Sequence, residues 1–254
     1  MDISLIGLAI GLLLLLIPFY FLHLYRTGLV RALAVGAVRM TVQLALIGVY
    51  LRYLFEWDLP WLNMLWVVIM VIVAAWTAVS RTRLSMRVMF VPSIVAFFVT
   101  AMIIGLYFLI LILCLERPFT AQYFIPIMGI LLGNMLSVNV IAISSYYGSL
   151  RRERQLYYYL LGNGATRFEA TLTFMRDAIV KAFSPCIANM AVMGLVSLPG
   201  TMIGQILGGS LPGVAVKYQM LIIIITLVAS SISVMITCRL SDARIFDNCD
   251  RIID

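Results

Sequence analysis

Long apolar segments separated by short polar connectors fill most of this 254-residue chain. A helix needs ~20 mainly apolar residues to cross the hydrocarbon core of a bilayer. No segment shows the period-2 alternation that is typical of strands. We therefore expect an all-α integral membrane protein with one transmembrane domain over residues 1–254. Its seven predicted transmembrane helices cover residues 3–25, 32–55, 62–80, 89–113, 123–146, 184–209 and 217–239.

One polar interruption breaks this pattern between residues 146 and 185. It begins with an arginine-rich run at residues 151–154 and continues through Gly162-Asn163-Gly164, a combination that favours a turn. Thr166 is suited to cap the following helix, and Glu169 three residues later would complete a capping box. The pattern predicts one cytoplasmic segment that consists of two helices joined by a turn.

The composition and the placement of charge support a membrane protein and fix its orientation. The chain is 63% hydrophobic with a mean hydropathy of +1.08, which excludes a soluble domain. The outer connectors hold few basic residues, namely Arg52, Arg117 and Lys217. The opposite side holds the arginines and lysine of 146–185 and also Arg26, Arg31, Arg81, Arg83, Arg87, Arg239, Arg244 and Arg251. Because basic residues gather in cytoplasmic loops, the N-terminus is predicted outside and the C-terminus inside, and the net charge of +7 does not indicate a nucleic-acid partner.

Polar residues inside the spans need an explanation, because they are costly there. Arg39 and Gln43 are four residues apart and share one helix face. An arginine at mid-helix costs roughly 2.5–3.5 kcal/mol. Arg39 either faces a substrate or an anion, or it ties two helices together, for example through Asn134.

Glycine and proline residues indicate a site of close helix packing and, further along the chain, a break in a helix. The spacing Gly129-x-x-x-Gly133 allows another helix to approach closely, although a role in ligand binding stays open. In the 184–219 region, Pro199-Gly200 should break or kink a helix. A broken backbone survives at membrane depth where protein buries it or where it lines a cavity, and transporters often place substrate there. Two interpretations of this glycine-rich region remain open: tight helix packing and a translocation path. The residues predicted for such a path are Arg39, Gln43, Asn134, Asn189, Pro199, Gly200, Met202, Gln205 and Gln219.

The chain lacks the usual parts of an enzyme or a metal centre, so we expect a non-enzymatic protein with no cofactor of its own. Its acidic residues fall in connectors or tails, which argues against acid–base catalysis and against proton coupling. No G-x-x-x-x-G-K-[ST] sequence is present to hold nucleotide phosphates. The cysteines stand far apart, which argues against a zinc or disulfide framework; they are Cys114, Cys186, Cys238 and Cys249. Inside the spans the available metal donors are amides, hydroxyls, thioethers and Cys186, and no metal ligands can be assigned.

Several motifs resemble those of the FetB (YbbM)-type permeases of ABC transporters, a family of iron exporters with plant relatives linked to aluminium tolerance. The resemblance covers almost the entire chain. It rests on the run Val196-Ser197-Leu198-Pro199-Gly200-Thr201-Met202-Ile203-Gly204-Gln205-Ile206-Leu207-Gly208-Gly209, on Arg39-x-x-x-Gln43-Leu44, Ala74-Ala75-Trp76 and Gly133-Asn134-Met135, and on Gly164-Ala165-Thr166 followed by Arg176-Asp177.

The resemblance implies a permease subunit in a bacterial inner membrane that exports iron or another metal. It implies a permease homodimer paired with cytoplasmic ABC ATPase subunits, which bind the ATP and Mg. The coupling segment would contact the ATPase through Gly162, Gly164, Ala165, Thr166, Arg167, Phe168, Leu172 and Arg176. A different interpretation lays the same segment on anionic lipid as an amphipathic helix. Other functions also stay open: an ATP-independent secondary transporter or channel, or ABC transport of a non-metal substrate such as a nucleotide sugar.

Overall fold

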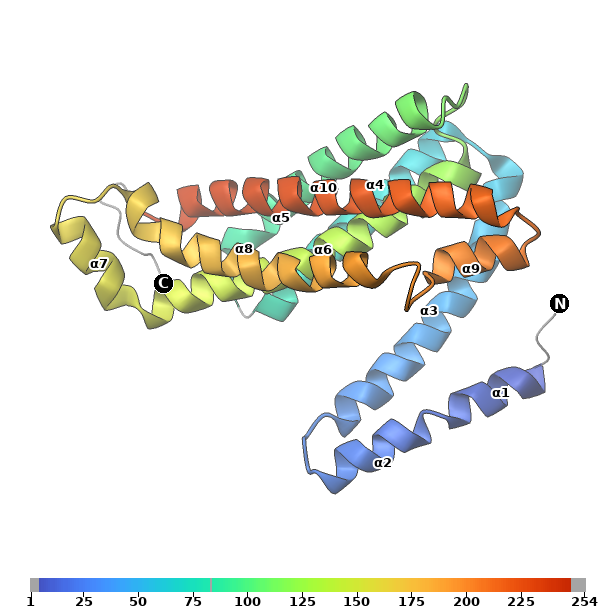
Figure 1. Cartoon of the computed structure of the whole chain (residues 1–254), viewed down its shortest axis with the longest axis horizontal. Coiled ribbons are helices and arrows are strands. Elements are labelled where there is room, and N and C mark those ends of the chain that lie inside the picture. The colour runs from blue at the N-terminus through green and yellow to red at the C-terminus, as the bar shows by residue number, and fades with distance from the viewer. Residues whose placement is uncertain (1–4, 83, 248–254) are drawn as a thin grey trace. The chain divides into compact units, whose positions relative to one another are not determined.

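The computed structural model describes residues 5–82 and 84–247, which are almost entirely helical (Figure 1). No β-strand occurs among these residues; Met193 and Ser197 form an isolated bridge. The predicted all-α class is confirmed. The first residues of the predicted span 3–25 lie outside the described chain, as do Arg83, Cys249 and Arg251.

The chain forms two compact units, Met1–Trp57 and Asp58–Asp254. The first unit contains α1 (Leu5–Leu13), α2 (Leu16–Leu24) and α3 (Val30–Trp57). The second contains α4 (Pro60–Thr82), α5 (Met86–Leu106), the π-helix η1 (Tyr107–Ile112), α6 (Ala121–Arg152), α7 (Arg154–Gly162), α8 (Arg167–Val192), α9 (Gly200–Leu207) and α10 (Pro212–Ile245).

Five helices of the described chain are long and apolar enough to cross a membrane. They are Val30–Trp57, Pro60–Thr82, Met86–Ile112, Ala121–Arg152 and Pro212–Ile245. The other two predicted spans are not single long helices. The segment 3–25 contains two nine-residue helices, α1 and α2, because the α-helical hydrogen bonding is interrupted between Leu13 and Leu16.

The predicted span 184–209 is also wrong as a continuous helix. Helix α8 ends at Val192, and the chain turns before α9 begins at Gly200. Gly194 adopts a φ of 85°, which glycine reaches without steric cost, and its N–H donates to the Ser197 carbonyl at 3.0 Å. Apolar composition located this segment, but it could not locate the turn within it.

The predicted C-terminal end of the cytoplasmic segment also needs correction. Pro185 was expected to close that segment, but it lies inside α8, a helix of 26 residues. The predicted interruption near Pro199 is present, with Pro199 as the N-cap of α9. The break therefore lies between residues 193 and 199, and α8 continues without interruption from the α7–α8 turn into the apolar sequence.

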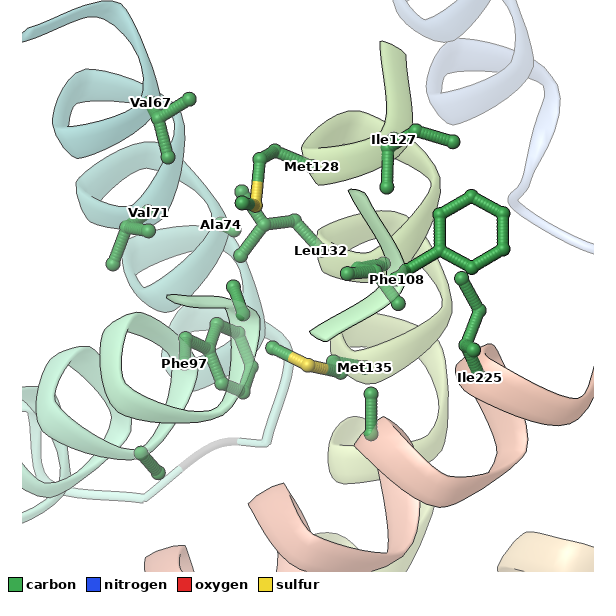
Figure 2. Close-up of a cluster of buried hydrophobic side chains, with 14 of the residues drawn as sticks. Val67, Val71, Ala74, Phe97, Phe108, Ile127, Met128, Leu132, Met135 and Ile225 are labelled. Carbon is green, nitrogen blue, oxygen red and sulfur yellow. The ribbon is translucent and has the colours of Figure 1, made fainter. Parts of the chain in front are cut away.

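The core of the second unit lies between α4, α5, α6 and α10 (Figure 2). Val71 of α4, Phe97 of α5 and Met135 of α6 are among its fully buried side chains. The Met128 side chain of α6 packs directly on Gly105 of α5, so a Cβ built on this glycine would overlap it. In a bilayer, such close packing takes the place of the hydrophobic driving force between helices.

Helix α6 is held at its start and along its length. The Asp58 carboxylate accepts the Ala121 backbone N–H at 2.7 Å, which satisfies one of the free donors at a helix N-terminus. Deeper in the unit, the Asn139 Nδ2 donates to the Ser233 Oγ of α10 at 2.7 Å. On another side α6 packs against α8, where Tyr146, Ala170 and Phe174 belong to a second apolar cluster. Helix α6 is thus the scaffold for both α8 and α10.

Candidate functional site

A groove runs between α8 and α10 in the second unit. Both helices pack on α6, and they run in opposite directions, as the orange and red ribbons of Figure 1 show. Two cavities follow one another along the groove: Ser230 lines the first and Ser231 the second. We call the first the neutral pocket and the second the charged pocket.

The neutral pocket has a volume of about 410 Å³ and lies beside the break between α8 and α9. Its lining consists of Gly129, Ile130, Gly133, Asn134, Cys186, Asn189, Met190, Met193, Thr201, Gln219, Ile222, Ile223, Thr226, Leu227 and Ser230. None of these described lining residues is charged. A Cβ built on Gly133 would meet no atom within 4 Å, so in this unit no neighbouring helix packs on that glycine.

Three amide side chains give the neutral pocket its hydrogen-bonding capacity. Gln219 is 9% exposed, and its Oε1 accepts a hydrogen bond from the Thr201 hydroxyl. The Asn134 Nδ2 donates to the Ile130 carbonyl at 2.9 Å, so its Oδ1 keeps its acceptor capacity. The amide of Asn189 makes no hydrogen bond within the described chain. A polar, uncharged group in this pocket would find both donors and acceptors.

The predicted translocation residues divide into three groups. Asn134, Asn189 and Gln219 come from three different helices and line the same pocket. Four others lie at or after the break between α8 and α9 but do not line the neutral pocket: Pro199, Gly200, Met202 and Gln205. Arg39 and Gln43 lie on α3, in the first unit. Whether any of them contacts a substrate stays a prediction.

Three hydroxyl residues line this pocket without having been predicted for it: Thr201, Thr226 and Ser230. A signal was present, because polar residues recur at helical spacing along the apolar sequence of α10. The stripe comprises Gln219, Thr226, Ser230, Ser233 and Thr237. Cys186, Met190 and Met193 also line the pocket, but they were not predicted for the translocation path, since sulfur side chains do not interrupt an apolar segment.

The charged pocket has a volume of about 540 Å³ and lies at the other end of the groove. Arg167, Arg239 and Asp242 line it, together with apolar side chains of α8. The Tyr147 hydroxyl of α6 donates to the Asp242 Oδ1 at 2.9 Å, which ties the end of α10 to α6. The Arg167 guanidinium lies 5.4 Å from the centre of the Phe246 ring, within the range of a cation–π interaction.

The predicted helix–turn–helix is present beside this charged pocket. Helix α7 ends at Gly162, and α8 begins at Arg167. Gly164 lies in the turn with a φ of 89°. The Ala165 N–H donates to the Leu160 carbonyl at 3.1 Å and so closes the end of α7, as is usual where a glycine follows a helix.

The predicted capping box at the start of α8 is confirmed. The Thr166 side chain accepts the Glu169 backbone N–H at 3.3 Å, and the Glu169 carboxylate accepts the Thr166 N–H at 2.8 Å. The hydrogen bond from the Thr166 backbone, followed by the one from its hydroxyl, holds the pKa of Glu169 below its ordinary value. Two of the free donors at the helix start are thus satisfied.

The first turns of α8 expose an apolar stripe. Phe168 is 70% exposed and Leu172 is 50% exposed, and both line the charged pocket. Arg176 is also exposed on α8. The eight residues of the predicted coupling set thus extend from the last residue of α7, through the turn, into the third turn of α8. Their contact with an ATPase stays a prediction.

No group of three or more His, Cys, Asp or Glu side chains within the described ranges is placed to hold a metal ion. The donors in the neutral pocket are amides, hydroxyls and sulfur atoms. The oxygen ligands of hard cations usually include carboxylates, and the described lining supplies no carboxylate. The pocket is therefore suited to neutral hydrogen-bonding groups or to soft ions.

Comparison with known proteins agrees with these observations. The model of the uncharacterised protein family UPF0014 matches residues 5–246. The chain is 30% identical over 251 residues to an Escherichia coli protein named "Probable iron export permease protein FetB", which covers 97% of this chain and 94% of the relative. It is 27% identical to the Bacillus subtilis "UPF0014 membrane protein YjkA", with 95% of each chain covered.

A plant protein is also similar. The Arabidopsis thaliana protein named "Protein ALUMINUM SENSITIVE 3" is 32% identical over 77% of this chain and 70% of its own length. No solved structure gives a significant match. With its apolar helices, the chain is a multi-pass membrane protein, and the bacterial inner membrane fits its permease relatives. By the extent of the family match and by its identity to a permease of nearly equal length, this chain belongs to the UPF0014 family of membrane proteins.

Proposed function

We propose that the chain is the transmembrane permease subunit of an ABC transporter that exports iron or another metal. A separate ATPase subunit would hydrolyse the ATP and bind the Mg, and the assembly would contain two permeases. The name of the E. coli relative supports the permease role and the metal substrate. The absence of a phosphate-binding G-x-x-x-x-G-K-[ST] sequence in this chain supports a separate ATPase.

The capped turn between α7 and α8 is the observation that carries the proposal. It presents a rigid helix start with Phe168 and Leu172 exposed. An apolar stripe at helical spacing is suited to a groove on a partner protein. Arg167 and Arg176 would form the charged rim of that contact, and Gly162, Gly164 and Ala165 would shape the turn.

The orientation that follows places the α7–α8 turn and the C-terminus in the cytoplasm. The arginines at residues 151–154 support this side, because cytoplasmic loops are enriched in basic residues. Since α8 is continuous from Arg167 to Val192, a displacement of the turn would be transmitted along this helix to the neutral pocket. Movement of α8 against α10 would then open or close the groove.

The test is a co-purification and an ATPase assay with a candidate ABC ATPase subunit from the same organism. The expected result is a stable complex whose ATP hydrolysis rises with substrate. Leu172→Ala should weaken the complex at least tenfold, whereas Val180→Ala, a matched control at a site 56% exposed on the same helix, should not. Flux without ATP and without any co-purifying ATPase would replace this proposal with a secondary transporter or channel.

The neutral pocket favours one further candidate, ATP-driven transport of a neutral non-metal substrate. Three amide and three hydroxyl side chains line the same cavity, and hydroxyl-rich molecules such as the sugar part of a nucleotide sugar would use them. Stimulation of the ATPase by such molecules and not by metal ions would select this candidate.

A further inference from the structure

We propose that Cys186, Met190 and Met193 form a binding site for a soft monovalent cation of the Cu(I) class. The proposed site lies inside the neutral pocket. That the ion is cargo rests on the proposed function; that it binds does not. The inference rests on the placement of the sulfur atoms, on the available donor atoms and on the charge of the pocket.

The first observation is the placement of the three sulfur side chains. Cys186 and Met190 are four residues apart on α8, and Met193 follows after three more as the C-cap of that helix. This spacing puts all three on one helix face. All three line the neutral pocket, at the point where the chain leaves α8 for the break.

The second observation is that the sulfur atoms are available. Met190 is 43% exposed and is therefore not fixed in a packed core. The Cys186 thiol donates a weak hydrogen bond to the Ala182 carbonyl at 3.8 Å, which leaves its sulfur lone pairs for another partner. Cys186 forms no disulfide in the described chain. The cluster thus offers one thiol and two thioethers to the same cavity.

The third observation is the type of metal-donor atom that the neutral pocket contains. The described lining of the neutral pocket contains neither a carboxylate nor an imidazole. Those are the ligands that divalent cations of the first transition row commonly use, whereas thiolate and thioether ligands select soft ions such as Cu(I). The Asn189 amide, three residues after Cys186, could supply a further neutral donor.

Charge decides between monovalent and divalent soft ions. Coordination by Cys186 releases the thiol proton to water, since cysteine binds metals as the thiolate. One thiolate and one monovalent cation form a neutral site. A divalent cation would leave one positive charge uncompensated in a pocket whose described lining has no charged residue, and an unpaired charge in such surroundings is costly.

The experiment uses the full-length protein in lipid nanodiscs without the ATPase. Cu(I) is delivered anaerobically from a competing chromogenic chelator, and Fe(II) and Zn(II) are titrated in parallel. The expected result is one Cu(I) per chain, with Fe(II) and Zn(II) bound at least tenfold more weakly. X-ray absorption of the Cu(I)-loaded protein should show sulfur neighbours.

The variants locate the site. Met190→Leu/Met193→Leu and, separately, Cys186→Ser should each weaken Cu(I) binding at least tenfold. Met235→Leu in the charged pocket and Cys114→Ser at an exposed position are the matched controls, and neither should change the affinity. If Cys186→Ser fails to fold, the double methionine variant decides, and its melting temperature should stay near that of the wild type.

Three results would overturn the inference: no stoichiometric Cu(I) binding, binding that is unchanged in both sets of variants, or Fe(II) binding as tight as that of Cu(I). The coupling proposal fails by a different measurement. If the ATPase does not associate but Cu(I) binds, the site stands and the ABC assignment falls. If the ATPase is coupled but Cu(I) does not bind, only the site falls.

Discussion

Helix α6 has two sides that differ in how their side chains are used. On one side, Met128 and Met135 are fully buried against α4, α5 and α10. On the other, Gly133 and Asn134 are exposed to the groove between α8 and α10. The buried side holds the helices in place, whereas the groove side leaves backbone and amide groups uncovered. Residues one position apart in the sequence therefore have opposite roles.

Polar residues show the same contrast. Asn139 is fully buried and uses its amide to join α6 to α10 through Ser233. Asn134 bonds only within its own helix turn in the described chain and faces a cavity. A polar group in a membrane helix is thus structural where a fixed partner takes it up, and is a candidate ligand where it faces an open cavity.

The largest expected effect separates two phenylalanines. Phe97→Ala in the core should lower the free energy of unfolding by about 3 kcal/mol, because the packed cluster cannot collapse into the space left. Phe168→Ala on the exposed stripe should change stability by less than about 0.5 kcal/mol but weaken ATPase association. Thermal unfolding in detergent and co-purification measure the two effects, and equal loss of stability in both variants would contradict the comparison.

Two glycines give the next effect. Gly105→Val should destabilise the protein by about 1–3 kcal/mol, because its added carbons would overlap the Met128 side chain. Gly133→Val has open space before it, so the fold should persist while substrate stimulation of the ATPase falls. A Gly133→Val protein that unfolds as readily as Gly105→Val would show that another part of the chain fills this space.

The two asparagines should differ by about 1 kcal/mol. Asn139→Ala removes a buried interhelical hydrogen bond and leaves the Ser233 hydroxyl without its donor, at a cost of about 1 kcal/mol. Asn134→Ala loses a bond to its own helix and should leave the melting temperature nearly unchanged. A lower melting temperature for Asn134→Ala than for Asn139→Ala would reverse the assigned roles.

The smallest effect concerns the capping box. Thr166→Ala should cost about 0.5 kcal/mol, at the low end for loss of an N-cap. The folded pKa of Glu169 lies below its ordinary value of 4.5. The stabilisation by its carboxylate is therefore complete above pH 4.5 and is lost as the pH falls through the lowered folded pKa. Part of the difference in melting temperature between wild type and Thr166→Ala should thus disappear at low pH, because the Thr166 hydroxyl then no longer donates to a charged carboxylate, whereas its bond from the Glu169 backbone N–H remains. A difference that does not change with pH would contradict a contribution of the Glu169 carboxylate to the cap.

Much of this architecture follows from the sequence, and the exceptions have physical causes. Apolar segments of sufficient length located the five long helices, and Thr166 with Glu169 located the start of α8. Hydropathy could not find the turn at Gly194, because an apolar loop and an apolar helix have the same composition. For the same reason, two nine-residue helices were predicted as one span.

The site was predicted only where polarity marks it. Asn134, Asn189 and Gln219 stand out among apolar neighbours, and all three line the neutral pocket. Gln205 stands out equally but lies on α9 without lining that pocket. Sequence spacing within one helix gives the face that a residue occupies, whereas convergence of three helices on one cavity depends on their packing.

Replacing a glutamine by leucine at two positions, one inside the neutral pocket and one outside it, decides whether substrate passes through this pocket. Substrate-stimulated ATP hydrolysis would be measured in proteoliposomes that contain this chain and its ATPase. Gln219→Leu should reduce the stimulation at least tenfold while assembly and basal hydrolysis persist, and Gln205→Leu should leave it nearly unchanged. Full stimulation in Gln219→Leu together with its loss in Gln205→Leu would contradict the assignment of the pocket.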